Sequence, residues 1–219
     1  MSNEIISFPH LGDYYNPIKK LLESVTKMKV VPSPPITKKT IELGSKYSPD
    51  SVCVPFKYNL GNYIEALENG ATILIQAGGG CRFRYYAEVQ EIILKDLGYK
   101  FKFIQLIGKN RLNFNELYSI FKKLNPGLKK RSFIHEILYC ILYILFLDKL
   151  DSKIRKKIGF EVNKGSLEKI KKGFINKCNK SSKITTLFWL YIKYSLKISR
   201  VQTKKVKNKI KVGIIGELY

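Results

Sequence analysis

Short apolar segments of strand length alternate with longer segments of helical spacing along the first half of the chain. Four segments have the apolar or β-rich composition of strands: 4–8, 30–31, 71–77 and 102–107. Four segments carry apolar residues three or four positions apart: 15–25, the stretch that Thr37 caps and Gly44 closes or bends, the stretch that holds Leu60, Ile64 and Leu67, and the stretch from about Tyr85 to Leu97. The order β-α-β-α-α-β-α-β predicts an α/β fold with a parallel, doubly wound, Rossmann-like sheet over residues 1–108.

The rest of the chain follows a different pattern. Residues 112–200 show helical periodicity with many lysines and no clear strand, so we expect a basic helical region over residues 109–205. The segment 209–219 returns to strand composition, and we expect residues 206–219 to be the first strand of an incomplete second α/β domain. Because a lone strand cannot bury both faces, we expect a truncated reading frame or a piece of a longer protein. Its free edge predicts a homo- or hetero-oligomer.

Charge divides the chain in the same place. The 219 residues carry a formal net charge of +23, yet residues 1–99 hold 11 basic and 10 acidic side chains, whereas residues 100–211 hold 29 and 6. Such a region could neutralise phosphates. However, lysine far outnumbers arginine, and neither a helix-turn-helix nor an aromatic RNA-binding pattern is found. We therefore expect no specific nucleic-acid binding, and favour a solvated face or a surface for an acidic partner.

Two apolar runs bear on membrane association. The longer run, 133–147, has 15 residues and contains His135 and Glu136, whereas a bilayer span needs about 20 apolar residues. The second run, 184–196, contains Lys193. We expect no transmembrane segment and interpret both runs as buried helices of a bundle. The flanking lysines leave interfacial membrane binding as the alternative. The N-terminus lacks the pattern of a signal peptide, and four cysteines are too few for a disulfide scaffold, so we expect a cytoplasmic protein with reduced thiols.

Three side chains are expected near the carboxyl ends of the strands, where ligands gather in open parallel sheets. His10 follows the first strand, Cys81 follows the 71–77 strand, and Cys53 directly precedes a helix whose dipole would favour a thiolate. The glycines at 78–80 permit close approach of a bulky group. Two converging thiolates would suit a soft metal or an iron–sulfur cluster. Without a C-x-x-C pair, two buried structural cysteines are the alternative.

The other candidate residues have structural explanations. Cys140 lies in the apolar run, where packing is its expected role, and Cys178, between two polar residues, is expected to be exposed or half-buried. His135 and Glu136 are interpreted as a helix-surface pair. The glycine-rich turn fails the dinucleotide-binding pattern because position 83 is Phe, and no P-loop occurs.

Several motifs occur together in the order that one known family has. They are FPHLGDYY at 8–15, PPITKKT at 34–40, LGSKYSPD at 43–50, CVPFK at 53–57, GGGCR at 78–82 and KVGIIGELY at 211–219. The set resembles the family of CoA-substrate-specific enzyme activases and 2-hydroxyacyl-CoA dehydratase-like proteins of anaerobic bacteria. The resemblance covers the first 108 residues and the last eleven well, and the helical middle weakly.

This resemblance implies Rossmann-like domains around a [4Fe–4S] cluster held by cysteines, with low-potential electrons as its chemistry. In the dehydratases, one electron enables removal of water from a 2-hydroxyacyl-CoA through a ketyl radical. Cys53 and Cys81 match the family's N-terminal cysteine motifs and are the implied cluster ligands, with a further ligand expected from the second domain. His10, with Gly79 and Gly80, is expected to line the cofactor site, His10 as a donor to a sulfur or to a bound acyl-CoA.

The sequence is therefore compatible with two functions. The first is an iron–sulfur component of the dehydratase or activase type, with an acyl-CoA substrate or a partner subunit. The resemblance implies a small residue at the position of Arg84, and the bulk of the arginine would alter that site. The second is a non-catalytic interaction module whose basic helical region docks an acidic partner or an anionic surface.

Overall fold

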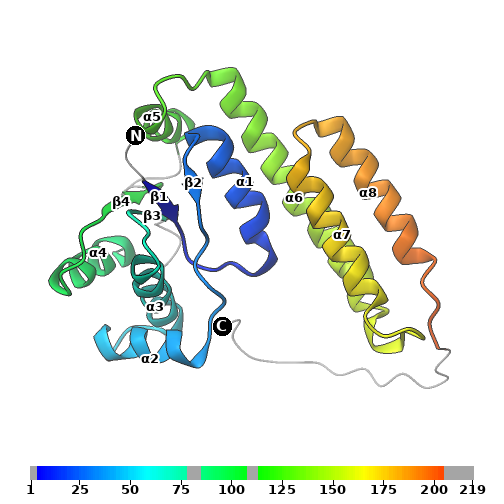
Figure 1. The fold of residues 1–219 in the computed structure, drawn as a ribbon, viewed down its shortest axis with the longest axis horizontal. Helices are drawn as coiled ribbons and strands as arrows, with labels where there is room; N and C mark the ends of the chain where they lie inside the picture. The colour runs from blue at the N-terminus through cyan, green and yellow to red at the C-terminus, as the bar shows by residue number, and fades with distance from the viewer. Residues whose placement is uncertain (1–3, 78–84, 108–112, 205–219) are drawn as a thin grey trace. The chain divides into compact units, whose positions relative to one another are not determined.

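The structure is a computed structural model that describes residues 4–77, 85–107 and 113–204 (Figure 1). Its contacts divide the chain into two compact units, with the division after Ile134: unit 1 lies before that point and unit 2 begins at His135. The strand expected within 206–219 lies outside the described residues, as do Gly79, Gly80 and Cys81.

Unit 1 contains a four-stranded sheet in which all strands are parallel, in the order β2-β1-β3-β4. The strands are β1 (Ile5–Ser7), β2 (Lys29–Val30), β3 (Ile73–Gln76) and β4 (Lys102–Gln105). The helices are α1 (Tyr15–Thr26), preceded by a 3₁₀ turn at Gly12–Tyr14, α2 (Lys38–Tyr47), α3 (Val54–Glu68), α4 (Tyr86–Asp96) and α5 (Phe114–Leu124). The predicted parallel α/β fold and its order of elements are confirmed.

The strand order creates a switch point between β1 and β3. From β1 the chain moves to β2 on one side, then crosses back to β3 and β4 on the other side. Because parallel crossovers are right-handed, α1 and the α3–α4 pair cover opposite faces of the sheet, as Figure 1 shows. The sheet is buried at its centre: Ile6 pairs with Ile73, and both side chains are fully buried.

Helices α2 and α3 lie close together because each has a glycine where the backbone of the other helix approaches. A Cβ on Gly44 would lie 1.7 Å from the carbonyl oxygen of Lys57, and a Cβ on Gly61 would lie 1.9 Å from that of Thr40. Gly44 was expected to close or bend its helix, but α2 continues to Tyr47. The glycine is needed for helix contact rather than for termination.

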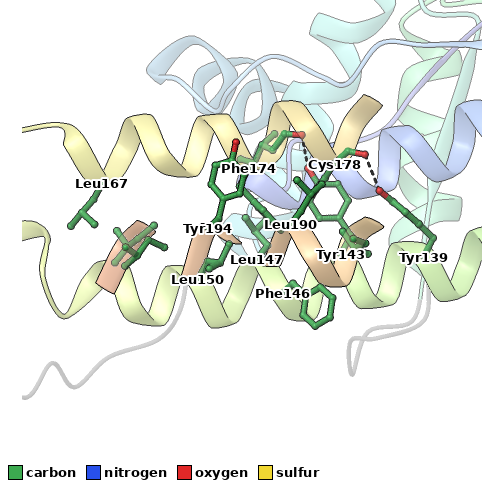
Figure 2. Close-up of a cluster of buried hydrophobic side chains, with 14 residues drawn as sticks. Tyr139, Tyr143, Phe146, Leu147, Leu150, Leu167, Phe174, Cys178, Leu190 and Tyr194 are labelled. Carbon is green, nitrogen blue, oxygen red and sulfur yellow. Dashed lines mark hydrogen bonds between the residues drawn. The ribbon is translucent and has the colours of Figure 1, made fainter. Parts of the chain in front are cut away.

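Unit 2 is built from α7 (Ser166–Lys180), α8 (Ile184–Ser199) and most of α6 (Lys130–Arg155), with a 3₁₀ turn at Ile158–Phe160. Figure 2 shows its apolar core, in which tyrosines of α6 point toward α7. Tyr139 donates a hydrogen bond to the carbonyl of Cys178 (2.9 Å), and Tyr143 donates one to the carbonyl of Ile175 (3.3 Å). The expected helical bundle is present. No helix within the described ranges has both the length and the apolar character needed to cross a bilayer.

The start of α7 depends on a carboxylate from outside the helix. Glu161 accepts hydrogen bonds from the backbone N–H groups of Gly165 (3.1 Å) and Leu167 (2.6 Å) and from the Ser166 hydroxyl (2.9 Å). These donors, the Leu167 N–H above all, hold the pKa of Glu161 below its usual value. The ionised carboxylate therefore caps α7.

Replacing this carboxylate should give a pH-dependent loss of stability. A group whose pKa is lowered by folding stabilises above its ordinary pKa, and that contribution disappears as the pH falls through the folded value. Glu161→Gln should therefore lower the Tm at pH 7, with the difference from wild type shrinking below about pH 4. Thermal melts across this range test it, with Glu42→Gln on α2, an exposed partner of Lys38, as control. A Tm difference that is equal at pH 3 and pH 7 would contradict the assignment.

The glycine contact between α2 and α3 predicts a steric effect. Gly61→Ala should reduce the free energy of unfolding by about 1–3 kcal/mol, because the added methyl group meets the Thr40 carbonyl. Gly127→Ala is the matched control in unit 1, since its Cβ would meet only the Asn125 side chain, at 3.4 Å. Urea denaturation followed by circular dichroism measures both variants. Equal effects of the two substitutions would disprove the close contact.

Candidate functional site

The carboxyl edge of the sheet in unit 1 is lined by the beginnings of helices. Each helix of a right-handed crossover runs antiparallel to the strands, so α1, α3 and α4 all start at this edge. Helix N-termini present unpaired N–H groups and a positive dipole end. An anionic or electron-rich group would therefore be favoured here, at the place where open parallel sheets bind their ligands.

Cys53 is the described thiol at this edge. It is the N-cap residue of α3, its backbone is extended (φ −71°, ψ 160°), and its side chain makes no capping hydrogen bond. The residue is half-buried and packs against the apolar cluster of α3 and α4. Burial, and next the charge of Cys53, raise the pKa of the neighbouring Tyr58 hydroxyl. The thiol is accessible and positioned at the positive end of a 15-residue helix.

Tyr86, in the first turn of α4, brings a hydroxyl to this thiol. Its oxygen is in hydrogen-bond contact with Cys53 Sγ, and its ring packs edge-on against Phe56 with the centroids 5.1 Å apart. A tyrosine hydroxyl can act as a hydrogen-bond donor to a sulfur atom. The first turns of α3 and α4 are thus joined around one sulfur atom.

A pair of buried amides lies next to this junction. Gln90 of α4 donates from Nε2 to the carbonyl of Phe56 (3.2 Å), and its Oε1 accepts from Gln76 Nε2 (2.7 Å). Because Gln76 donates through Nε2, its Oε1 is the free end of the amide, and this buried atom has no hydrogen-bond partner among the residues that the structure describes. Gln76 is the last residue of β3 and only 8% exposed. It offers a buried acceptor at the carboxyl end of a central strand.

His10, in the loop after β1, contacts α3 at another position, Asn62. Its backbone N–H donates to Oδ1 of Asn62 (3.0 Å), and its Nδ1 accepts from the N–H of Gly12 (3.2 Å). Asn62 is fully buried and also donates to the carbonyl of Pro34 (3.1 Å), so it connects the loops after β1 and β2. Asn62 lies nine residues after Cys53, which corresponds to about 13 Å along the helix.

The predicted site residues are therefore distributed as follows. Cys53 contacts Tyr86, whereas His10 is held at the third turn of α3, and no contact between Cys53 and His10 is found in the described ranges. Cys81, Gly79 and Gly80 belong to 78–84, outside those ranges. Among the residues that are described, no group of three or more His, Cys, Asp or Glu side chains could hold a metal ion.

The remaining cysteines lie in the core of unit 2. Cys140 is buried as expected, and burial, assisted by Glu136, raises the pKa of its thiol to about 12. The expectation that Cys178 is exposed or half-buried was wrong, because its side chain is fully buried. Leu167, Phe174 and Cys178 recur at helical spacing on the inner face of α7. Of the polar neighbours of Cys178, Lys177 is exposed, and Asn179 accepts a hydrogen bond from Tyr143 (3.2 Å).

Sequence reasoning missed the polar side chains that support the site: Asn62, Gln76, Tyr86 and Gln90. One signal was available, since Gln76 ends an otherwise apolar strand, where a polar side chain requires a partner or a ligand. Asn62 likewise interrupts the apolar spacing of α3. Their partners come from residues 14 to 52 positions away, which no local pattern reveals.

The difference in burial predicts selective thiol chemistry. In a Cys81→Ser background, an alkylating reagent at pH 8 should modify Cys53 alone in the folded protein, because the reactive species is the thiolate and the other thiols are buried. Cys140 and Cys178 should react only in denaturant. Mass spectrometry of the labelled peptides counts the sites. Labelling of Cys178 under native conditions would refute its placement in the core.

Comparison with known proteins identifies no relative. No family model matches the chain, and neither a curated protein nor a solved structure is similar to it. The resemblance to the dehydratase-like family therefore rests on the motifs quoted above, of which FPHLGDYY, PPITKKT, LGSKYSPD and CVPFK lie in described residues.

Proposed function

We propose that the chain is an iron–sulfur protein of the 2-hydroxyacyl-CoA dehydratase or activase type, in which unit 1 provides a cluster-binding edge. Cys53 and Cys81 are the proposed cluster ligands. The observation that carries the proposal is the half-buried Cys53 thiol at the positive end of α3, on the carboxyl edge of a parallel sheet. A bound [4Fe–4S] cluster would supply low-potential electrons.

The donor chemistry of Cys53 fits such a group. A cluster ligand is a cysteine sulfur, and Cys53 presents its sulfur at the N-terminus of α3, in hydrogen-bond contact with the Tyr86 hydroxyl. Hydrogen bonds to a ligating sulfur tune a cluster, and Tyr86 is placed to donate one. By contrast, Cys140 and Cys178 lie in the core of unit 2 and are not candidate ligands.

The neighbouring polar groups fit a substrate with hydrogen-bond donors. Gln76 Oε1, which has no partner within the described part of the chain, can accept a hydrogen bond from a hydroxyl or an amide N–H, both of which a 2-hydroxyacyl-CoA carries. His10 is fixed by Asn62 and lies farther along α3, so in this proposal it binds an extended part of the substrate rather than the sulfur.

Anaerobic reconstitution of the full chain with ferrous iron and sulfide tests the proposal. The wild-type protein should bind iron and sulfide in equal amounts and turn brown. Cys53→Ser and Cys81→Ser should each abolish binding, because oxygen is a poor substitute for a thiolate ligand of iron. Cys140→Ser is the matched control and should retain the iron.

Circular dichroism of each sample establishes that the helices are intact. A folded wild-type protein without iron would overturn the proposal. Iron that persists in Cys53→Ser would also overturn it, because Cys53 would then not be a ligand of the cluster.

A further inference from the structure

The outer face of α6 is apolar although it is exposed. Residues 137–147 contain no charged side chain, and the positions of this stretch that reach solvent are Leu138, Ile141 and Leu145. Their spacing of three and four residues places them on one side of the helix, away from the core residues Tyr139, Tyr143, Phe146 and Leu147. A helix that is apolar all round is normally covered on every side.

Helix α8 carries a second stripe of the same kind. Phe188, Trp189, Ile192 and Leu196 are between 45% and 57% exposed, while Leu187, Leu190, Tyr194 and Ile198 form its core side. The two stripes border one seam, because Phe146 of α6 contacts Phe188 (ring centroids 4.9 Å apart) and stacks on Tyr191 (4.5 Å). We name the exposed side chains of both stripes the α6–α8 face.

Helix α7 is different on its outer side. Its exposed positions are all polar or charged: Glu168, Lys169, Lys172, Asn176, Lys177, Asn179 and Lys180. Figure 2 shows the core between α7 and α6, with Phe146 directed away from α7. Unit 2 is thus amphipathic as a whole: α7 presents a hydrated surface, and the α6–α8 face presents an apolar one. Exposed apolar area of this kind marks an interaction surface.

Lysines border the α6–α8 face. On α6, the exposed Lys149 follows Leu145 by four residues, next to the exposed Asp148. On α8, the Lys193 ammonium lies 4.6 Å from the centroid of the Trp189 ring. Residues 135–204 as a whole hold 16 basic side chains, 14 of them lysines, and only five acidic ones. A partner that binds the α6–α8 face must therefore offer an apolar region to the exposed apolar side chains and negative charge to the lysines around them.

We propose that the α6–α8 face binds the surface of an anionic lipid bilayer. Leucine, isoleucine and aromatic side chains would enter the boundary between headgroups and acyl chains, and the bordering lysines would bind lipid phosphates. Tryptophan prefers this boundary, and lysine reaches outward from it along its apolar stem. The pair of Trp189 and Lys193 has both properties within one helical turn.

Two other occupants fit less well. A second copy of the chain, related by a two-fold axis, would bring the same lysines against each other, which is repulsive. The interface of a stable protein complex is usually poor in lysine and rich in arginine, whereas residues 135–204 have only two arginines, Arg155 and Arg200. Lysine beside exposed aliphatic and aromatic side chains favours the bilayer.

Trp189 makes the proposal directly measurable, because it is the single tryptophan of the chain and is 57% exposed. The probe is the full chain titrated with vesicles of phosphatidylcholine alone or of equal parts phosphatidylcholine and phosphatidylglycerol. Tryptophan emission should shift to the blue with the anionic vesicles and stay unchanged with the neutral ones. Brominated acyl chains in the anionic vesicles should quench it, since the ring lies at the depth of the upper acyl chains.

Matched variants separate the apolar from the electrostatic contribution. Ile192→Ser should weaken partitioning about tenfold, whereas Ile92→Ser on α4, with 58% exposure against 55%, should not. Removing one charge with Lys149→Gln should weaken partitioning about fivefold, while Lys169→Gln on α7 should have a smaller effect. These substitutions lie at exposed positions, and circular dichroism checks that the helices persist.

Three results would overturn the proposal. The first is an emission of Trp189 that no vesicle changes, which would favour an acidic protein as occupant. The second is a blue shift that depends on protein concentration without vesicles, which would indicate a second copy. The third is equal loss of partitioning in Ile192→Ser and Ile92→Ser. None of them bears on iron binding by Cys53, so the two proposals fail independently.

Discussion

Helix α3 is buried around most of its circumference, and each polar group that it carries inward is held by a different part of unit 1. Asn62 binds the loops after β1 and β2, Glu65 accepts a hydrogen bond from Thr40 of α2 (2.8 Å), and the Tyr63 hydroxyl donates to the carbonyl of Ile75 in β3 (3.1 Å). Buried polar groups without partners are costly, so this one helix fixes the sheet, α2 and two loops relative to each other. The position of Cys53 at its first turn follows from that constraint.

Most of the fold could be predicted from the sequence because its signals are local. Apolar runs of strand length and 3.6-residue spacing depend on neighbours only a few positions apart, and they gave the correct order of strands and helices in unit 1. The expectation that Gly44 ends its helix was wrong because the glycine serves a contact with another helix: the approach of the Lys57 carbonyl explains why a glycine lies inside α2. The exposure of Cys178 was wrongly predicted from its two polar neighbours, whereas its spacing of four residues from Phe174 indicates a position in the core.

The candidate site could be predicted only in part. The position of Cys53 before a helix is visible in the sequence, as is the placement of His10 after a strand. The distance between them is not, because it depends on which turn of α3 the loop after β1 reaches, and Asn62 sets that turn. The hydrogen bond between the amides of Gln76 and Gln90 could not be predicted either, since a bond between a strand and the next helix produces no periodic pattern in the sequence.

The excess of lysine in unit 2 has a further consequence for its own stability. Residues 135–204 hold 16 cationic side chains and only five anionic ones, and the uncompensated cations repel one another, which opposes folding of the bundle. Lys157 is used to offset part of this, because its ammonium donates to the carbonyls of Ile198 (3.0 Å) and Ser199 (2.8 Å) at the negative end of α8. Added salt would screen the repulsion and strengthen the bundle, while the same screening would weaken its attraction to any anionic surface. Fold and attachment would thus respond to ionic strength in opposite directions.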